Sequence, residues 1–166
     1  MNTTKSFAHK NWLKAVISRS RTFIICLMLA AGTSAAVAQT APVAEVWKDA
    51  SCGCCGEWVR HMEEAGFKVK VHNEGNAEAR KRLGMPVKYG SCHTTKVGKY
   101  VVEGHVPAAD IKRLLQEKPA AKGLAAPGMP VGSPGMDGPD YDGQKDAYDV
   151  LLIKNDGSSS VYQSHR

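Results

Sequence analysis

Four cysteines lie at positions where they could do chemistry. Three are in the segment Ser51-Cys-Gly-Cys-Cys-Gly56, and Cys92 follows in Gly90-Ser-Cys-His-Thr94. Thiolates bind soft metal ions, and closely spaced cysteines also form redox-active dithiols. The cysteines therefore indicate either metal binding or thiol–disulfide chemistry.

Cys54 favours metal binding. A dithiol oxidoreductase needs only Cys52 and Cys55, which have the Cys-x-x-Cys spacing. The additional thiol of Cys54 can close on Cys55 only through a strained ring, whereas its thiolate can bind or bridge a soft ion. We predict that Cys52, Cys54, Cys55 and Cys92 bind Cu(I), which soft thiolate ligands select. Four clustered thiolates could hold more than one such ion.

Three alternatives stay open from the cysteines alone. One is a pair of disulfides, with three connectivities, although near-adjacent cysteines make poor long-range crosslinks. Another is a closed structural zinc site, but Cys92 has no cysteine partner three positions away. The third is a thiol–disulfide oxidoreductase that uses Cys52 and Cys55 and for which Cys54 is dispensable.

Histidines and methionines are weaker candidate ligands. His93 directly follows Cys92, and adjacent side chains of a regular strand point to opposite faces, so both reach one ion only where the backbone is irregular. His105 is expected in a loop at the edge of the cluster. Met129 and Met136 carry thioethers in a repeated Pro-Gly-Met unit. These thioethers are soft ligands, or they fill gaps where the loop packs on the core.

An export signal precedes the cysteines. Residues 1–38 carry basic but no acidic residues, and an apolar run at 22–31 is followed by Ala36-Val-Ala38. This order is typical of a secretory signal peptide cleaved after Ala38. The apolar run is shorter than the roughly 18 residues of a membrane span. We therefore expect a periplasmic protein without a membrane anchor, in which four cysteines remain once Cys26 has left with the leader.

Cleavage would also change the charge. The full chain has 22 Lys and Arg against 16 Asp and Glu, a formal charge of +6. Five of the basic residues lie in the leader, which leaves 17 basic against 16 acidic residues, a charge of +1. Without a basic stripe, nucleic-acid binding has no electrostatic support. No Ser-His-Asp arrangement or phosphate-binding loop stands out, so hydrolytic and nucleotide chemistry are unsupported.

The residue pattern predicts the elements that position the cysteines. Alternating apolar and polar residues predict strands at 44–49, 67–72, 94–97 and 100–103. Helices are predicted at 55–65, at 76–83 and from Pro107 to near Pro119. This β-α-β-α-β-β-α order predicts an α/β, thioredoxin-like mixed sheet flanked by helices. In such a fold Cys92, at the entrance to the hairpin, faces the other three cysteines.

The rest of the chain is predicted to be a loop and a second hairpin. Residues 119–146 are rich in Pro, Gly and Asp and are predicted to form one long loop. Strands at 148–153 and 159–163 flank Asn155-Asp-Gly157, a strong hairpin signal. We therefore predict a single metal-binding domain, residues 39–166, whose additional C-terminal hairpin extends the sheet.

Four segments together resemble one known family. They are Cys-Gly-Cys-Cys-Gly-Glu-Trp at 52–58, Ser-Cys-His-Thr at 91–94, Val-Val-Glu-Gly-His-Val-Pro-Ala at 101–108 and Pro-Gly-Met-Pro-Val-Gly-Ser-Pro-Gly-Met at 127–136. They resemble the CopG-type periplasmic copper-resistance proteins. The resemblance implies a thioredoxin-like fold, copper binding by the four cysteines with His105 and Met129 nearby, and a role in copper tolerance, with redox handling of Cu(I) and Cu(II) as one route. The expected partners are copper ions and copper exporters or other periplasmic copper proteins.

Overall fold

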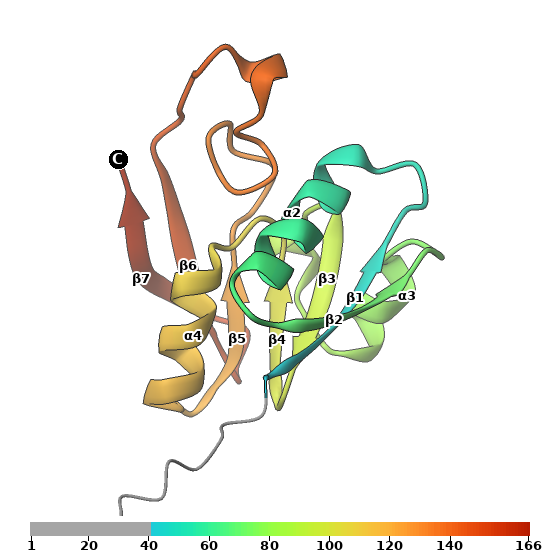
Figure 1. Ribbon diagram of the computed structural model, residues 1–166. Coiled ribbons are helices and arrows are strands. Elements are labelled where there is room, and N and C mark those ends of the chain that lie inside the picture. Colours follow the sequence, from blue (N-terminus) through green and yellow to red (C-terminus); the bar gives the residue numbers. More distant parts are fainter. Residues whose placement is uncertain (1–40) are drawn as a thin grey trace, which may run out of the picture. The chain divides into compact units, whose positions relative to one another are not determined.

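A seven-stranded mixed sheet lies at the centre of the computed structural model, which describes residues 41–166 (Figure 1). The predicted signal peptide lies outside the described residues. The strands are β1 (Val43–Lys48), β2 (Lys68–His72), β3 (His93–Val97), β4 (Tyr100–Glu103), β5 (Ala121–Ala125), β6 (Tyr148–Lys154) and β7 (Ser159–His165). Their order in the sheet is β2-β1-β3-β4-β5-β6-β7. β1 and β2 are parallel, as are β4 and β5, and the other neighbours are antiparallel. The predicted mixed α/β class is confirmed.

Helices cover both faces of the sheet. They are α2 (Gly53–Glu64), α3 (Ala77–Arg82) and α4 (Ala108–Glu117), with short 3₁₀ helices at Val87–Tyr89 and Pro139–Tyr141. α2 and α4 pack on the face that carries Val102 and Leu124. The segment that follows α3 packs on the opposite face, against Val101 and Ala125. In the part of the chain that the structure describes, no helix has the length and hydrophobicity of a membrane span.

The main core depends on one face of α2. Cys55, Trp58 and Met62 are buried at helical spacing. The Trp58 indole N–H donates a hydrogen bond of 2.9 Å to the Val106 carbonyl, so the polar edge of the ring is satisfied inside the core. Gly66 has a left-handed φ of +88° directly after the helix, as expected for a C-terminal glycine. This face of α2 therefore packs into the main core.

The prediction of a continuous loop over residues 119–146 is wrong at its start, because β5 occupies Ala121–Ala125. The segment reads Ala-Lys-Gly-Leu-Ala, without the β-branched residues that mark a strand. Its conformation comes from its neighbours, since β5 completes the sheet between β4 and β6. A Cβ at Gly123 would lie 1.7 Å from the Val101 carbonyl oxygen, so only glycine fits this close pairing. The predicted C-terminal hairpin is confirmed and extends the sheet through β5.

His61 links α2 to α4. Its Nε2 accepts a 3.1 Å hydrogen bond from the backbone N–H of Ala108, the first residue of α4. Burial lowers the pKa of His61, an effect that the charges of Asp137 and Glu64 oppose and that of Arg60 reinforces. Only the neutral ring can accept this bond, so protonation of His61 removes it.

We predict that His61 makes the fold less stable in mild acid. Because its folded-state pKa lies below the ordinary 6.5, the unfolded chain takes up a proton first, and stability falls as the pH drops below about 6.5. His61→Ala should cost about 1 kcal/mol near pH 7.5 and should lose less stability than wild type on going to pH 5.5. Urea unfolding followed by circular dichroism measures both effects. The same pH dependence in both proteins would show that His61 is not its source.

Candidate metal centre

The four predicted cysteine ligands converge at one end of the sheet. The sulfur atoms of Cys52, Cys54, Cys55 and Cys92 lie within 4.8 Å of one another. Cys52 is the N-cap residue of α2, Cys54 and Cys55 lie in its first turn, and Cys92 directly precedes β3. The pairing of β1 with β3 brings these segments together, because it sets Lys48 at the end of β1 opposite His93 at the start of β3.

Two of these cysteines are oxidised in the structure. Cys52 and Cys55 form a disulfide, and Cys54 and Cys92 are free thiols. The sulfur of Cys54 lies 3.6 Å from that of Cys52. Because a disulfide sulfur is not a thiolate ligand, binding of metal by all four cysteines requires prior reduction of this disulfide.

His105 is oriented as a ligand beside Cys92. Its Nδ1 lies 2.8 Å from the Pro134 carbonyl oxygen, which can only accept, so Nδ1 carries the ring proton. The unprotonated Nε2 then points at the Cys92 sulfur, 3.0 Å away. Metal-binding histidines usually donate the N–H of their second ring nitrogen to a carboxylate, carbonyl or water in this way. The buried ring of His105 is therefore prepared to accept either a thiol proton or a metal ion.

His93 is buried next to this pair. Its ring lies between those of Trp58 and His105, with centroid distances of 4.4 and 4.9 Å. Its Nδ1 lies 3.6 Å from the Cys92 sulfur, and its Nε2 has no hydrogen-bond partner within the described residues. Complete burial lowers the pKa of His93 well below its ordinary value, so the ring is neutral. Cys92 precedes the regular part of β3, which allows Cys92, His93 and His105 to form a second group of potential ligands within 4.8 Å.

Cys92 belongs to both groups. Burial raises the pKa of its thiol to about 11, and the charge of the neighbouring Cys54 acts in the same direction. At neutral pH the Cys92 thiol is therefore protonated in this oxidised state and can donate to His105 Nε2. A metal ion that binds Cys92 has to displace this proton.

The second Pro-Gly-Met unit closes over the cysteines. Gly135 has a φ of +84°, and a Cβ there would lie 2.5 Å from the Cys54 carbonyl oxygen and 2.8 Å from the backbone nitrogen of Trp58. Met136 is buried and its sulfur accepts a 3.2 Å hydrogen bond from the Tyr141 hydroxyl. Met129, in the first unit, is 52% exposed, and its role as a ligand stays a prediction.

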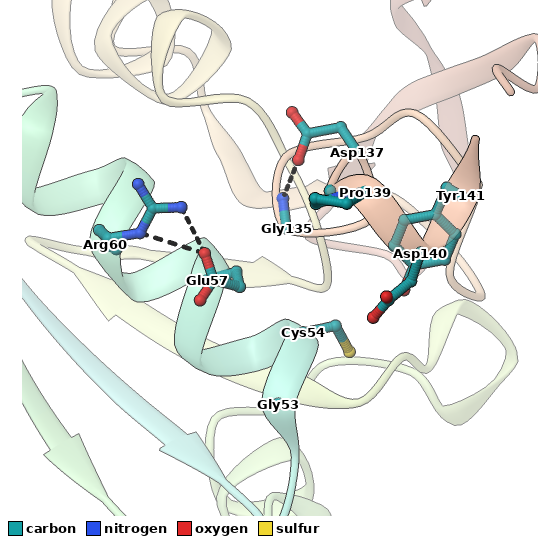
Figure 2. Close-up of a pocket in the computed structure, with 10 residues that line it drawn as sticks. Gly53, Cys54, Glu57, Arg60, Gly135, Asp137, Pro139, Asp140 and Tyr141 are labelled. Carbon is teal, nitrogen blue, oxygen red and sulfur yellow. Dashed lines mark hydrogen bonds and ion pairs between the residues drawn. The ribbon is translucent and has the colours of Figure 1, made fainter. Parts of the chain in front are cut away.

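A pocket of about 450 Å³ opens beside Cys54 (Figure 2). Its lining includes the carboxylates of Glu57, Asp137 and Asp140. Arg60 is also part of the wall, where its guanidinium is paired with Glu57. Cys54 is thus the cysteine that faces this pocket, at the open side of the cluster.

Two solved structures are similar to the chain over most of its length. Both are described as "Copper resistance protein copG". Form 2 is 46% identical, with 76% of this chain and 99% of that chain covered and a TM-score of 0.69. Form 1 is 47% identical, with 74% and 96% covered and a TM-score of 0.67. This chain belongs to the CopG family of copper resistance proteins.

The other comparisons add one family model. The model described as "Protein of unknown function, DUF411" matches residues 89–136, which include Cys92, His93, His105 and both Pro-Gly-Met units. A comparison with curated proteins finds no significant match. The resemblance to CopG seen in the sequence motifs is confirmed, and with it a copper-related function for a cysteine cluster that can hold a metal ion.

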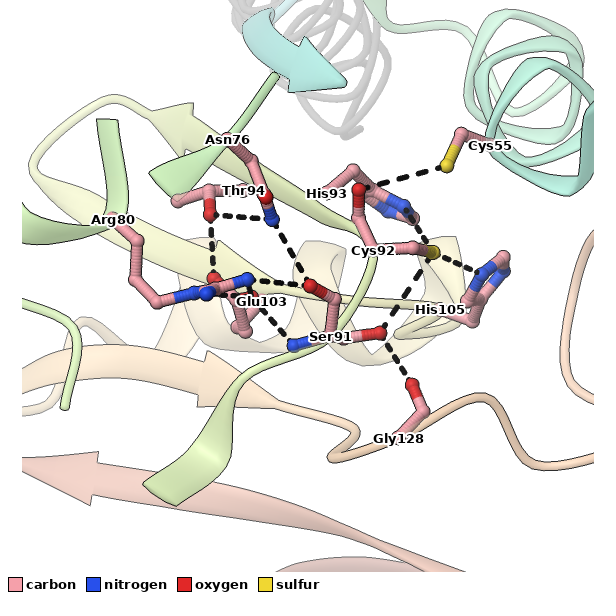
Figure 3. Close-up of polar contacts among 10 residues, drawn as sticks. All are labelled: Cys55, Asn76, Arg80, Ser91, Cys92, His93, Thr94, Glu103, His105 and Gly128. Carbon is pink, nitrogen blue, oxygen red and sulfur yellow. Dashed lines mark hydrogen bonds and ion pairs between the residues drawn. The ribbon is translucent and has the colours of Figure 1, made fainter. Parts of the chain in front are cut away.

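The sequence analysis missed a polar network behind Cys92 in this CopG protein (Figure 3). At its centre is the fully buried carboxylate of Glu103, which accepts hydrogen bonds from the side chains of Arg80 and Thr94 and from the Ser91 N–H. The one local signal is a charged residue in the apolar run Val-Val-Glu-Gly. Its partners come from other elements, so the sequence pattern does not reveal them.

We predict that a side chain at Gly135 disrupts the packing of the second Pro-Gly-Met unit on α2. Gly135→Ala combines an unfavourable positive φ with two backbone clashes and should destabilise the fold by about 1–3 kcal/mol. It should also speed alkylation of Cys54, because the loop moves away from α2. Urea unfolding and mass-spectrometric mapping of alkylated cysteines measure the two effects.

Gly138→Ala is the matched control for this substitution. Gly138 lines the same pocket, but its φ is −75° and a Cβ there would meet no atom within 4 Å. It should change stability by less than about 0.5 kcal/mol. Equal effects of the two substitutions would contradict the packing of Gly135 on α2.

Proposed function

We propose that this protein is an exported copper-binding protein that holds Cu(I) through Cys52, Cys54, Cys55 and Cys92 and thereby contributes to copper tolerance. The observation that carries the proposal is the convergence of four sulfur atoms within 4.8 Å in a member of a copper resistance family. Thiolates are soft ligands that prefer Cu(I) to hard ions such as Mg²⁺ and Ca²⁺. Export is proposed from the leader pattern at residues 1–38.

The position of the cysteines on α2 supports thiolate formation once the disulfide is reduced. Within residues 41–166, no side chain caps the N-terminus of α2, so the backbone N–H groups of its first turn can interact with sulfur. The positive end of the helix dipole lowers the pKa of thiols at this position in proteins generally. Cys52, Cys54 and Cys55 would supply the negative charge that a cation requires.

The two ligand groups support binding of more than one ion. They share Cys92, and a thiolate can bridge two soft ions. His105 would add a nitrogen ligand whose orientation Pro134 fixes. The carboxylates around the pocket would raise the local concentration of cations beside Cys54.

We also propose that residues 41–117 have a thioredoxin-like arrangement. The order β1-α2-β2-α3-β3-β4-α4, with β1 and β2 parallel and β3 and β4 antiparallel, supports this assignment. So does the Cys52–Cys55 pair at the N-terminus of the first helix of that unit.

The Cys52–Cys55 disulfide favours a second candidate function, that of a thiol–disulfide oxidoreductase. In that reaction a substrate thiolate attacks one sulfur of the disulfide to form a mixed disulfide, and a second substrate thiolate resolves it. The substrate thiols are oxidised to a disulfide and the Cys52–Cys55 pair is reduced. Cys54 takes no part in this exchange.

Anaerobic titration of the reduced protein with Cu(I), against a competing chromophoric chelator, tests the proposal. We expect wild type to withdraw copper from the chelator, with saturation above one ion per chain. Cys54→Ser should weaken retention by about tenfold or more, because a ligand of the cluster is lost. The same variant should keep wild-type rates of Cys52–Cys55 reduction and oxidation, measured with a small dithiol.

Two other outcomes would contradict this proposal. If neither protein competes with the chelator, copper binding is wrong and the oxidoreductase function is the one to pursue. If Cys54→Ser retains copper as wild type does, the four-sulfur cluster is wrong even though copper binds. Ser158→Ala controls for effects of purification and reduction on copper retention, because Ser158 lies in the exposed β6–β7 turn. It should retain copper as wild type does.

A further inference from the structure

We infer that Glu103 is a positioning residue of the metal centre, whose buried carboxylate fixes Cys92 relative to His105. The inference rests on the proposed function, because it concerns the same ligands. Glu103 is not one of the predicted ligands, and it lies outside the cysteine motif of residues 52–55.

Glu103 connects the two segments that carry Cys92 and His105. It is the last residue of β4, two positions before His105, and its side chain is completely buried. Its Oε1 accepts a 2.8 Å hydrogen bond from the backbone N–H of Ser91, the residue before Cys92 (Figure 3). One carboxylate therefore spans both sides of the 3.0 Å contact between Cys92 and His105.

The position of the carboxylate is itself fixed from two other elements. Arg80 of α3 reaches Oε1 with its Nε at 2.9 Å and its Nη2 at 2.7 Å. The Thr94 hydroxyl of β3 donates to Oε2 at 2.7 Å. Burial raises the pKa of Glu103, whereas the hydrogen bonds from Arg80, Thr94 and the Ser91 N–H lower it, with Arg80 the largest of the three. Arg80 thus provides the opposite charge without which a buried carboxylate would be strongly unfavourable.

The same network fixes the carbonyl of Ser91. Arg80 Nη2 donates to this oxygen, and so does Asn76 Nδ2 at 3.0 Å. The N–H and the C=O of Ser91 are therefore both bonded to side chains that belong to the network. The backbone that leads into Cys92 consequently has little freedom to rotate.

Gly104 keeps the two segments in direct contact. Its φ is +73°, and a Cβ there would lie 2.5 Å from the Ser91 Oγ and 2.6 Å from the Ala126 carbonyl oxygen. Its N–H donates a 3.0 Å hydrogen bond to the His93 carbonyl. With no space between them, a shift of Glu103 moves Ser91 and therefore Cys92.

Stability alone does not account for a charged pair at this position. Buried ion pairs are often no more stabilising than apolar residues of similar volume, and the neighbouring positions of β4 are apolar. What the pair supplies is a defined geometry at a ligand, and metal ligands need to be held to within about 0.5 Å. The convergence of the network on the residue before Cys92 fits that requirement.

Glu103→Gln tests the inference, with Asp110→Asn as its matched control. Asp110 is also a buried carboxylate bonded to a basic side chain, His165 at 2.8 Å, but it lies on α4 and takes no part in the Cys92 network. Two properties are measured in the full protein. They are Cu(I) retention against a chelator after reduction, and the alkylation rate of Cys92 in the metal-free protein.

We expect Glu103→Gln to weaken Cu(I) retention by about 10- to 100-fold, the range typical of residues that orient metal ligands. It should also speed alkylation of Cys92. Asp110→Asn should leave both properties at wild-type values even if it lowers the urea midpoint. Thr94→Val removes the bond to Glu103 Oε2 and a 3.4 Å bond from Asn76 Nδ2. It should act in the same direction as Glu103→Gln with a smaller effect, and it serves where Glu103→Gln does not fold.

The two readouts separate failure of this inference from failure of the proposed function. If wild type binds Cu(I) and both network variants match it in retention and in Cys92 alkylation, the positioning role is wrong and copper binding stands. If wild type does not bind Cu(I) but the network variants alone speed Cys92 alkylation, copper binding fails while Glu103 still positions Cys92. Equal effects of Asp110→Asn and Glu103→Gln would reduce Glu103 to a general contribution to stability.

Discussion

The antiparallel pairing of β1 with β3 is the constraint on which the candidate metal centre depends. β1 runs directly into the cysteine turn and the N-terminus of α2, and β3 begins directly after Cys92. With Lys48 opposite His93, the ends of the two strands deliver four sulfur atoms to one place. A register shift would separate Cys92 from the other three, so the apolar residues that fix this sheet also fix the ligand set.

The two sides of the centre differ in their surroundings. On one side, Cys92 and His105 contact each other. The Glu103 network fixes the backbone before Cys92, and the Pro134 carbonyl accepts the N–H of His105. The cysteines of α2 lie beside Gly53 and Gly56, where an added Cβ would meet nothing within 4 Å. Close packing therefore does not require these two glycines, and they add no side chain of their own beside the cysteines. The Glu103 network therefore holds Cys92 in place, whereas the pocket gives access to Cys54.

Local patterns predicted the parts of this protein that local forces determine. The N-terminus of α2 at the cysteines, the entry of Cys92 into a hairpin and the turn at Asn155-Asp-Gly157 all depend on neighbouring residues, and the structure has them. β5 was not predicted, because its conformation comes from the strands on either side and not from its own sequence. The partnership of Glu103 with Arg80 joins residues 23 positions apart on two different elements, so no local pattern predicts it.

The disulfide and the metal compete for the same atoms. Cys52 and Cys55 cannot bind copper as thiolates while they are joined, so the redox state of this pair determines whether two of the four predicted ligands exist. The remaining predicted ligands, Cys54, Cys92 and the two histidines, are unchanged by this oxidation. Oxidation therefore removes Cys52 and Cys55 from the predicted ligand set, while Cys54 at the pocket and Cys92 beside the histidines stay free thiols. If the four cysteines bind copper as proposed, the oxidised protein keeps part of that site and reduction completes it.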